Sequence, residues 1–330
     1  MKAIVINRFG SSDVFEQAEL PMPQVGPGQV LVKVAATAIN PLDYKLRRGD
    51  FPGFTHDFPA VLHSDFAGTL VEVGSAVNGL QVGDPVYGCA GGIRGRQGAL
   101  AEYMLADAAL IARQPASLSA AEAATLPLVA ITAWEGLIDR VDIQPGHKVL
   151  VHAGTGGVGH IAAQLAKWRG AQVFTTVSSE KKAQLSRLYG ADHTINYREE
   201  TVADYVQRCT GGEGFDLIVD TVGGQVLEDS LTAAKVGGQV ITTLAMGNTD
   251  LTLAWARKLS LHCVNMTWPM ATGVGMEHHG FILREIARLV DAGLLQPLLD
   301  PQRFSFDEVH LAHAHAEAGD TLGKVSISHA

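Results

Sequence analysis

The sequence predicts an α/β protein in which a parallel, doubly wound sheet accompanies a β-rich domain. From residue 148 to about residue 266, short apolar strands alternate with helical patterns, which is typical of a parallel sheet with crossover helices. Before residue 112, strand patterns follow one another, separated by turns in which Pro and Gly cluster. The glycine-rich stretch KVLVHAGTGGVG, residues 148–159, opens the alternating part.

Composition limits the class of protein. The chain has 330 residues, which favours about two domains; 47% are hydrophobic and 18% charged, as in a compact soluble protein. The net charge of −9 argues against nucleic acid or an anionic membrane as partner. No apolar run approaches the roughly 18 residues of a membrane span, and Met1–Ile6 resembles a strand more than a signal peptide, so we expect a cytoplasmic protein.

The N-terminal half is expected to be an irregular β domain. Met1–Ile6, Val30–Val34 and Phe66–Val73 show strand patterns, and a glycine-rich connection from residue 88 to 98 leads to a further strand at Ala99–Tyr103. From residue 117 the pattern becomes helical: Ser119 is a candidate cap, Pro127 interrupts, and a helical period resumes to residue 138.

The glycine-rich stretch has the features of a dinucleotide-binding turn. Lys148–His152 is expected to be a buried strand, and a helix pattern begins at His160. Gly154, Gly156 and Gly159 have the G-x-G-x-x-G spacing, in which the first permits the tight turn, the second lets the backbone approach a pyrophosphate, and the third lets helix pack close to strand. The helix N-terminus then offers free N–H groups to the phosphates.

The rest of the chain continues the alternation and then changes. Further strands are expected at residues 171–177, 192–195, 216–220, 239–244 and 259–266, with helices such as residues 181–189, 281–292 and 308–318. A terminal strand, Lys324–Ser328, is expected to return to the first domain.

Several ordered stretches resemble one family, the medium-chain dehydrogenase/reductase superfamily. They are Asn40-Pro41-Leu42-Asp43, Ser64-Asp65-Phe66-Ala67-Gly68, Val82-Gly83-Asp84-Pro85-Val86, Gly98 to Tyr103, Pro145-Gly146, Gly190-Ala191-Asp192 and Gly323-Lys324-Val325. Within the superfamily, the chain is most similar to the zinc-independent quinone oxidoreductases of the zeta-crystallin type, over nearly all of its length.

The resemblance implies a GroES-like, β-rich catalytic domain and a Rossmann domain. We expect the catalytic domain at residues 1–120 and 268–330 and the NADP(H)-binding Rossmann domain at residues 121–267. It also implies NADPH as hydride donor, an active site between the domains, and a homodimer or homotetramer assembled near residues 239–244 and 259–266.

The sequence argues against a catalytic zinc. The zinc-dependent relatives use thiolate and imidazole ligands, but the region of Asn40 holds no cysteine, and the Gly-His-Glu-like stretch reads His63-Ser64-Asp65. No cysteine lies between Cys89 and Cys209, and the three cysteines of the chain are too scattered for a disulfide framework. His310, His313 and His315 are interpreted as a solvated helix side rather than a metal site.

His63 has two interpretations. It departs from the quinone reductase pattern, in which we expect glycine. It is either a proton donor on the substrate side, as an imidazole with a pKa near neutrality can be, or a histidine that is hydrogen-bonded in the domain interface. We favour the second, because position alone rarely identifies a catalytic group.

The second Rossmann strand favours NADPH over NADH. It ends in Ser178 and Ser179, where an NAD-dependent unit has a carboxylate, and Lys182 can supply charge to a 2′-phosphate unless it is an ordinary exposed lysine. Glu180 lies just past the discriminating position. For Asp220, a turn-capping role is nearly as plausible as a cofactor contact. With the residues implied by the resemblance, the predicted cofactor-binding set is Thr132, Gly154, Gly156, Gly157, Val158, Gly159, Ser178, Ser179, Lys182, Tyr197, Val222, Leu244 and Lys324.

Without zinc, the favoured reaction is hydride transfer to an acceptor that is already electron-poor, such as a quinone. Asn40 is a candidate to fix the carbonyl or the nicotinamide ribose, and Tyr44 or Lys45 to deliver a proton; alternatively, they are a turn asparagine, a packed aromatic residue and a solvent-exposed lysine. Reduction of an enone or enal is the alternative reaction. A non-catalytic, NADPH-binding structural or regulatory protein is the second alternative.

Overall fold

The computed structural model describes residues 1–54 and 57–329, which form two compact units. Unit 1 comprises residues 1–131, 267–293 and 297–330, and unit 2 comprises residues 132–266 and 294–296. Helix α3 (Pro127–Trp134) carries the chain from one unit to the other. Among the described residues, no helix is both long and apolar enough to cross a membrane.

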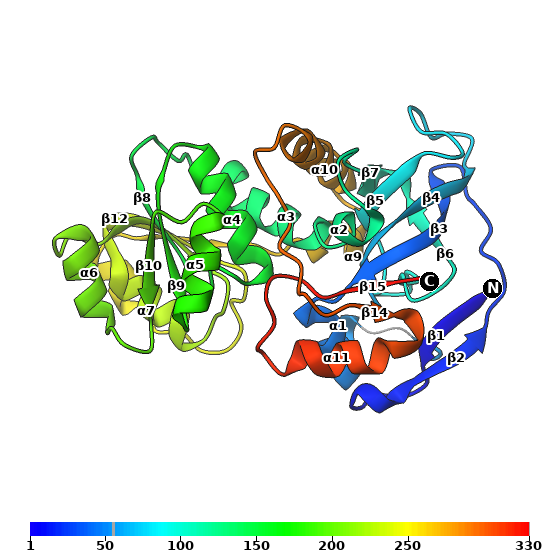
Figure 1. The fold of residues 1–330 in the computed structure, drawn as a ribbon, viewed down its shortest axis with the longest axis horizontal. Helices are drawn as coiled ribbons and strands as arrows, with labels where there is room; N and C mark the ends of the chain where they lie inside the picture. Colours follow the sequence, from blue (N-terminus) through cyan, green and yellow to red (C-terminus); the bar gives the residue numbers. More distant parts are fainter. Residues whose placement is uncertain (55–56, 330) are drawn as a thin grey trace. The chain divides into compact units, whose positions relative to one another are not determined.

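Unit 1 is built mainly of antiparallel strands (Figure 1). A seven-stranded sheet has the order β14-β15-β3-β4-β5-β7, with β6 paired to β3, and β1 and β2 form a separate pair. The strands are β1 (Lys2–Ile6), β2 (Phe15–Glu19), β3 (Gln29–Ala38), β4 (Asp65–Val73), β5 (Pro85–Cys89), β6 (Tyr103–Asp107), β7 (Ile111–Arg113), β14 (Phe304–Ser305) and β15 (Ser326–Ser328). This β-rich unit matches the GroES-like expectation.

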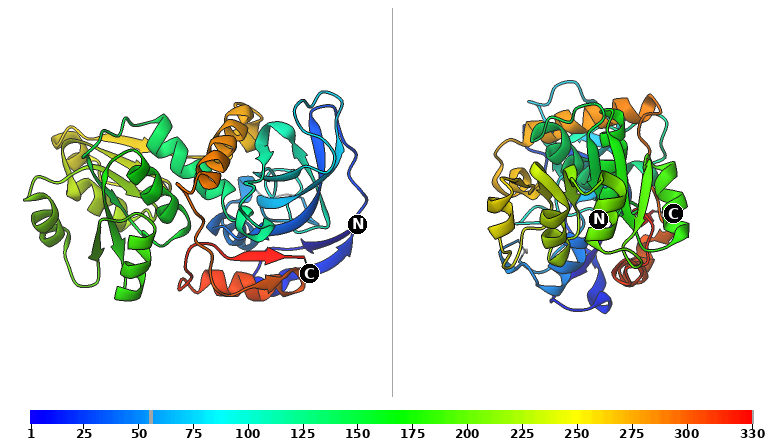
Figure 2. Two further views of the ribbon diagram at one scale, coloured as in Figure 1. Left: turned by 45° about the horizontal axis from the view of Figure 1, so that its top comes forward. Right: turned by 90° about the vertical axis from the view of Figure 1, so that its left-hand side faces the viewer.

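Short helices cover the sheet of unit 1. The α-helices are α1 (Pro41–Arg48), α2 (Ala120–Ala123), α9 (Thr267–Thr272), α10 (Met276–Asp291) and α11 (Val309–Glu317), and the 3-10 turns are η1 (Ser12–Val14), η2 (Pro52–Phe54), η3 (Ala108–Leu110) and η5 (Phe306–Glu308). Helix α10, the orange helix in the left view of Figure 2, packs against η3 and β7. The close approach requires Gly280, because a Cβ there would lie 2.6 Å from the Ala109 carbonyl oxygen.

The strand predicted at Ala99–Tyr103 is placed differently. Strand β6 begins at Tyr103, and the buried residues before it bond irregularly to two other segments: Ala99 N–H donates to the His63 carbonyl, and the Leu100 carbonyl accepts from Ile4 N–H. An apolar run that is buried between two partners has the composition of a strand without being one.

The C-terminal strand rejoins the first part of the chain, as predicted. Strand β15 pairs antiparallel with β3, with Ser326 opposite Ala38. The row of paired residues continues from Ala38 to Asp65 on β4 and to Cys89 on β5. The C-terminal segment is therefore brought beside the start of α1, which follows β3.

Unit 2 contains the predicted parallel sheet. Its six strands have the order β10-β9-β8-β11-β12-β13, and every pair in it is parallel. The elements are η4, a π-helical turn (Glu135–Asp139), β8 (Lys148–Val151), α4 (Gly157–Trp168), β9 (Gln172–Val177), α5 (Glu180–Leu188), β10 (His193–Asn196), α6 (Val202–Thr210), β11 (Phe215–Asp220), α7 (Gln225–Ala233), β12 (Ala234–Thr242), α8 (Thr252–Ala256) and β13 (Ser260–Cys263). The order places β8, which precedes the glycine-rich turn, at the centre of the sheet.

Two local predictions in the helices need refinement. Ser119 caps α2 with a reciprocal bond pair to Glu122, as predicted. Pro127, however, begins α3 instead of interrupting a helix, because proline fits the first helical turn, whose N–H groups lack partners. Helix α4 begins at Gly157, three residues before the predicted start at His160.

Candidate active site

The glycine-rich turn connects β8 to α4 and brings backbone atoms into unusually close contact. A Cβ on Gly154 would lie 2.5 Å from Thr175 Cβ, and one on Gly159 would lie 2.1 Å from the Ala153 carbonyl oxygen. At Gly156, which caps α4, the nearest atom would be that same oxygen at 3.1 Å. A side chain at position 154 or 159 would therefore clash with other atoms of the protein, whereas a side chain at position 156 would make only a close contact.

The tight turn runs from Ala153 to Gly156, whose N–H donates to the Ala153 carbonyl at 2.8 Å. Gly154 lies inside this turn without adopting a positive φ, whereas Ala153 has a φ of 53°, in the left-handed region. Position 154 also requires glycine because the side chains of Thr175 on β9 and Ser186 on α5 approach it. A non-glycine residue held in the left-handed region stores backbone strain, which often occurs at functional sites.

The end of β9 presents hydroxyl groups and a lysine. Ser179 caps α5, with its Oγ accepting from Lys182 N–H at 3.3 Å, while Ser178 is half-buried. Lys182 makes no ion pair with any residue that the structure describes, whereas Glu180 is paired with Arg187 at 3.3 Å. Tyr197, just after β10, is exposed. The segment after β9 therefore carries a lysine without an ion-pair partner among the described residues, next to a glutamate that is paired with Arg187.

Asp220 shapes the loop after β11. Its Oδ1 accepts from Val222 N–H at 2.9 Å and from Gly223 N–H at 2.8 Å, and its Oδ2 accepts from the Thr242 hydroxyl at 2.8 Å. The turn-capping interpretation accounts for all of these bonds. Val222 is left exposed at the end of the sheet, Leu244 is half-buried after β12, and Thr132 is buried in α3.

A buried polar cluster in unit 1 contains Asn40, Asp65 and Lys324. Lys324 Nζ donates to the Ile39 carbonyl at 2.6 Å and to Asn40 Oδ1, and lies 3.5 Å from Asp65 Oδ2. Asn40 Nδ2 donates to Asp65 Oδ2 at 2.8 Å. Burial raises the pKa of Asp65, and the Lys324 ammonium and the donated hydrogen bonds oppose that shift. Asp65 also accepts a hydrogen bond from the backbone N–H of Leu128.

Asn40 also begins α1. Its backbone N–H donates to Asp43 Oδ2 at 2.7 Å in a capping box, and Pro41 occupies the first helical position. Burial raises the pKa of Asp43 to about 7. The carboxamide of Asn40 is engaged at both ends within unit 1, so the geometry favours its structural role.

Tyr44 and Lys45 follow on the same helix and are half-buried. The Arg48 guanidinium lies 5.4 Å from the centre of the Tyr44 ring, and Lys45 Nζ lies 5.7 Å from that of Phe51. Partial burial raises the pKa of Tyr44, so its hydroxyl keeps its proton at neutral pH. Tyr44 therefore retains a proton that it can donate.

His63 is buried in unit 1 and has a φ of 73°. Its Nδ1 lies 3.1 Å from Thr37 Oγ1, and its Nε2 lies 2.8 Å from Nε2 of His313. Both ring nitrogens are thus used inside the unit, and burial lowers the pKa of His63 to about 3. Of the two interpretations of His63, the geometry favours the hydrogen-bonded histidine over the proton donor.

The interpretation of the three C-terminal histidines as a solvated helix side is wrong for His313. His310 is exposed, but α11 turns Val309, Ala312 and His313 inward, and His313 is fully buried. Its partners are His63 and the buried Arg47, whose guanidinium lies 3.0 Å from His313 Nδ1. His315 pairs with Asp300 instead. Sequence reasoning missed Arg47 and Thr37 as members of this cluster, because no local pattern links α1 to α11.

The described residues contain no group of three His, Cys, Asp or Glu side chains arranged to hold a metal ion. Of the positions resembling zinc ligands, Asn40 is hydrogen-bonded to Lys324 and Asp65, and Ser64 is buried with no hydrogen-bond partner for its hydroxyl among the described residues.

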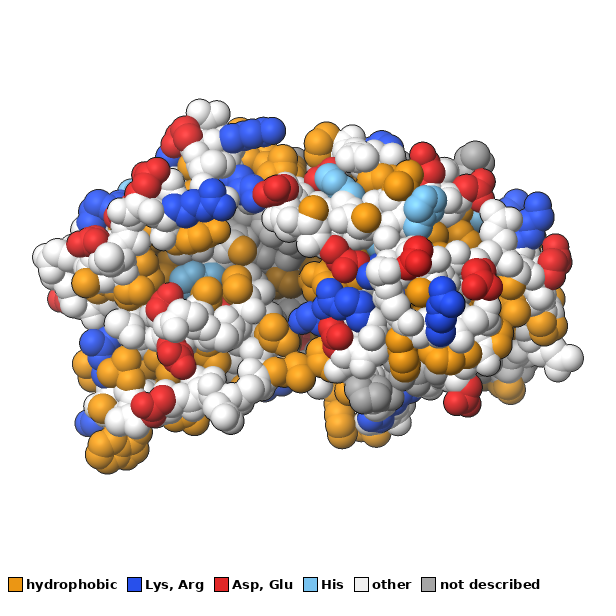
Figure 3. Space-filling model, turned by 90° about the horizontal axis from the view of Figure 1, so that it is seen from below, with side chains coloured by type: hydrophobic (Ala, Val, Ile, Leu, Met, Phe, Trp, Pro, Cys, Tyr) orange, Lys and Arg blue, Asp and Glu red, His pale blue; other side chains and the backbone are white. Residues whose placement is uncertain are grey.

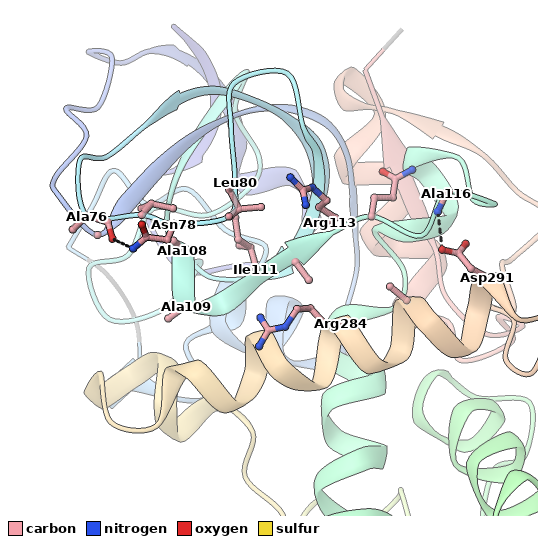
Figure 4. Close-up of a pocket in the computed structure, with 16 residues that line it drawn as sticks. Ala76, Asn78, Leu80, Ala108, Ala109, Ile111, Arg113, Ala116, Arg284 and Asp291 are labelled. Atoms are coloured by element: carbon pink, nitrogen blue, oxygen red, sulfur yellow. Dashed lines mark hydrogen bonds between the residues drawn. The ribbon is translucent and has the colours of Figure 1, made fainter.

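A hollow of about 820 Å³ lies elsewhere on unit 1 (Figure 4). It lies between the β4–β5 turn at Asn78, strand β7 and helix α10, with Arg113 and Arg284 along it. Arg113 is already paired with Asp84, and none of the predicted site residues lines this hollow. Its size therefore does not identify it as the active site.

Comparison with known proteins agrees with the fold. Residues 26–116 match the model of the alcohol dehydrogenase GroES-like domain, and residues 189–327 match that of the zinc-binding dehydrogenases. The 2-methylene-furan-3-one reductase of Solanum lycopersicum is 35% identical over 335 residues, which cover 99% of this chain and 79% of that protein.

Solved structures give the same assignment. An alcohol dehydrogenase superfamily protein from Novosphingobium aromaticivorans is 40% identical, with a TM-score of 0.94 and 99% of each chain covered. The Escherichia coli quinone oxidoreductase, solved as a complex with NADPH, is 26% identical, with a TM-score of 0.88 and coverage of 99% of this chain and 100% of that one. The chain therefore belongs to the medium-chain dehydrogenase/reductase superfamily, in its quinone oxidoreductase branch, and is an NAD(P)H-dependent oxidoreductase.

Proposed function

We propose that this protein is an NADPH-dependent reductase that transfers a hydride to a quinone without zinc. The observation that carries the proposal is the Asn40–Asp65–Lys324 cluster: Asn40, which by resemblance falls near a ligand position of the zinc-dependent relatives, is hydrogen-bonded to Asp65 and Lys324 instead. In the zinc-dependent relatives, the metal acts as a Lewis acid that assists oxidation of an unactivated alcohol. A quinone is electron-poor enough to accept a hydride without one.

The residues of unit 2 fit NADPH. Gly156 leaves the backbone bare at the N-terminus of α4, where N–H groups and the helix dipole favour a pyrophosphate. Gly157 and Val158 form the first turn of that helix, and Ser178, Ser179 and Lys182 would receive the 2′-phosphate. Tyr197, Val222, Leu244 and Thr132 complete the proposed contacts. The E. coli relative solved with NADPH supports this choice of cofactor.

In the proposed reaction, bound NADPH supplies the hydride and the protein supplies orientation and a proton. Reduction of a quinone to a hydroquinone takes up one hydride and one proton. Tyr44 and Lys45 are the proposed proton donors, because both lie on the helix that Asn40 begins and the Tyr44 hydroxyl keeps its proton at neutral pH. The remaining contribution is to hold donor and acceptor together, which can supply a large part of the rate enhancement.

Reduction of an enone or enal is the alternative reaction. The relative named 2-methylene-furan-3-one reductase acts, by its name, on a ketone conjugated to a methylene group. Such an acceptor takes the hydride at its β-carbon and the proton at its α-carbon, and it needs the same cofactor.

A comparison of acceptor panels distinguishes these reactions. NADPH oxidation is measured with a series of simple quinones and a series of simple enones, and NADPH deuterated at C4 shows where the label enters the product. A higher kcat/KM for quinones supports the proposal, and deuterium at the β-carbon of enones at higher kcat/KM supports the alternative. NADPH binding without turnover of either panel would indicate a non-catalytic binding protein.

The proposed partners are a small-molecule acceptor and further copies of this chain. Strand β13 is an edge strand of the sheet, paired only with β12, and offers its other side to a second copy in a homodimer or homotetramer. Light scattering during gel filtration tests this, since a monomer would contradict it. On the face in Figure 3, basic and acidic side chains are interspersed, which gives nucleic acid no basic surface there.

A further inference from the structure

Three oxygen atoms of unit 1 surround the Lys324 ammonium. Its Nζ donates hydrogen bonds to the Ile39 carbonyl and to Asn40 Oδ1, and it forms an ion pair with Asp65 Oδ2 at 3.5 Å. The side chain is also 3% exposed. A phosphate or a ribose of the cofactor would therefore have to displace these buried partners to bind Lys324, although family resemblance placed this residue among the cofactor contacts.

The same contacts fix the orientation of Asn40. Its Oδ1 accepts from Lys324 and its Nδ2 donates to Asp65, so the two ends of the carboxamide cannot be exchanged without losing both bonds. Asp65 is held in turn by the Leu128 N–H at 2.8 Å, in the first turn of α3. Asn40, the N-cap of α1, is thereby held by Lys324 of the C-terminal segment and by Asp65 of β4. Asp65 is itself held by α3.

Helix α1 depends on that cap for its direction. It has only eight residues, and a helix this short gains little stability by itself. Its first turn is closed by the bond from Asn40 N–H to Asp43 Oδ2. Tyr44 follows Asp43 directly, so a shift of the cap moves Tyr44 and Lys45 as well.

We propose that Lys324 is a positioning residue and not a cofactor ligand: it orients Asn40 and the first turn of α1, and so sets where Tyr44 and Lys45 present their protons to the acceptor. This inference rests on the proposed function, in which side chains of α1 serve the acceptor.

The test compares Lys324→Met with Lys182→Met. Both changes remove one ammonium and keep a flexible chain, but Lys182 lies in unit 2 at the proposed 2′-phosphate position. Each variant is assayed at a temperature at which circular dichroism shows that it is fully folded. For Lys324→Met we expect an NADPH Kd within about twofold of the wild type and a kcat reduced about tenfold or more, the scale that a small misplacement of reacting groups produces. For Lys182→Met we expect the NADPH Kd to weaken, which is the effect that the positioning role of Lys324 does not predict for Lys324→Met.

If Lys324→Met does not fold, the double variant Lys324→Met/Asp65→Asn takes its place, because it removes both buried charges together. A weakened NADPH Kd with a normal kcat would overturn the inference, and so would a lowered Tm with normal kinetics, since a purely structural role predicts that result.

If the wild type turns over no acceptor, the proposed function fails separately. The NADPH Kd and the NMR signal of a labelled Tyr44 ring then decide: an unchanged Kd with a shifted signal supports the inference, and a weakened Kd or an unmoved signal contradicts it.

Discussion

The Nε2 atoms of His63 and His313 lie 2.8 Å apart in the interior of unit 1, although 250 positions separate the residues in the chain. In each hydrogen bond around these two histidines, the donor and the acceptor can be assigned. Arg47 can only donate, so His313 accepts at Nδ1 and donates from Nε2 to His63. His63 then donates from Nδ1 to Thr37, whose hydroxyl donates to the Asp65 carbonyl at 2.6 Å. Both imidazoles are neutral in this arrangement.

Stability is therefore expected to fall as the pH drops below 6.5. Burial lowers the pKa of His63 from 6.5 to about 3, and it lowers that of His313 as well. Between these values the unfolded chain binds protons that the folded chain does not, so acid favours unfolding. Between about pH 6.5 and pH 5, the wild type should lose roughly 2 kcal/mol more than His63→Asn, which lacks this titration. Urea unfolding at several pH values measures the difference, and parallel curves for the two proteins would contradict the neutral pair.

The His63→Asn variant should remain an active reductase. Asparagine tolerates the left-handed backbone of position 63 and can still accept from His313. Because both nitrogens of His63 are used internally, we expect kcat within about threefold of the wild type, whereas loss of a general acid costs about a hundredfold or more. Steady-state kinetics with quinone, alongside Tm, distinguishes the two. A hundredfold loss at an unchanged Tm would restore His63 as proton donor.

Two glycines of the turn after β8 should respond differently to alanine. At Gly154 the new methyl group would lie 2.5 Å from Thr175 Cβ, so we expect Gly154→Ala to destabilise the protein by roughly 1–3 kcal/mol. At Gly156 the nearest atom is at 3.1 Å, so Gly156→Ala should keep its Tm closer to that of the wild type and lose NADPH affinity instead. Thermal unfolding and NADPH titration of both variants are the measurements. The idea fails if Gly156→Ala binds NADPH normally.

Lys182 should distinguish the two nicotinamide cofactors. It has no ion-pair partner among the residues that the structure describes, and it lies one turn beyond the Ser178–Ser179 end of β9. Lys182→Met should raise the KM for NADPH about tenfold or more, since a charge-assisted bond to phosphate is worth about 1.5–3 kcal/mol. The KM for NADH, which lacks the 2′-phosphate, should stay the same. Equal effects on both cofactors would place Lys182 elsewhere.

Local patterns allowed much of the fold to be predicted from the sequence. The alternation of strands and helices indicated the parallel sheet, and Ser119 with Glu122 indicated a cap that the structure contains. Both depend on residues that are close together in the chain. Resemblance added the GroES-like unit, which family comparison confirms.

The remaining features depend on distant residues. The burial of His313 and Arg47 arises only when α1 and α11 meet, and the contacts of Lys324 arise only when β15 returns to β3. Ala153 adopts a conformation that sequence reasoning reserves for glycine, because the turn after β8 imposes it. The domain boundaries at 120 and 267 and the assignment of the individual site residues stay predictions.

The central claim is reduction of an electron-poor acceptor by NADPH without a metal. The most direct measurement is the initial rate of NADPH oxidation with a quinone, using protein that has been treated with a strong chelator and whose metal content has been measured by plasma emission spectrometry. We expect the rate of the metal-depleted protein to equal that of the untreated protein and to exceed the rate with NADH. Activity that is lost on chelation and restored by Zn²⁺ would contradict the account.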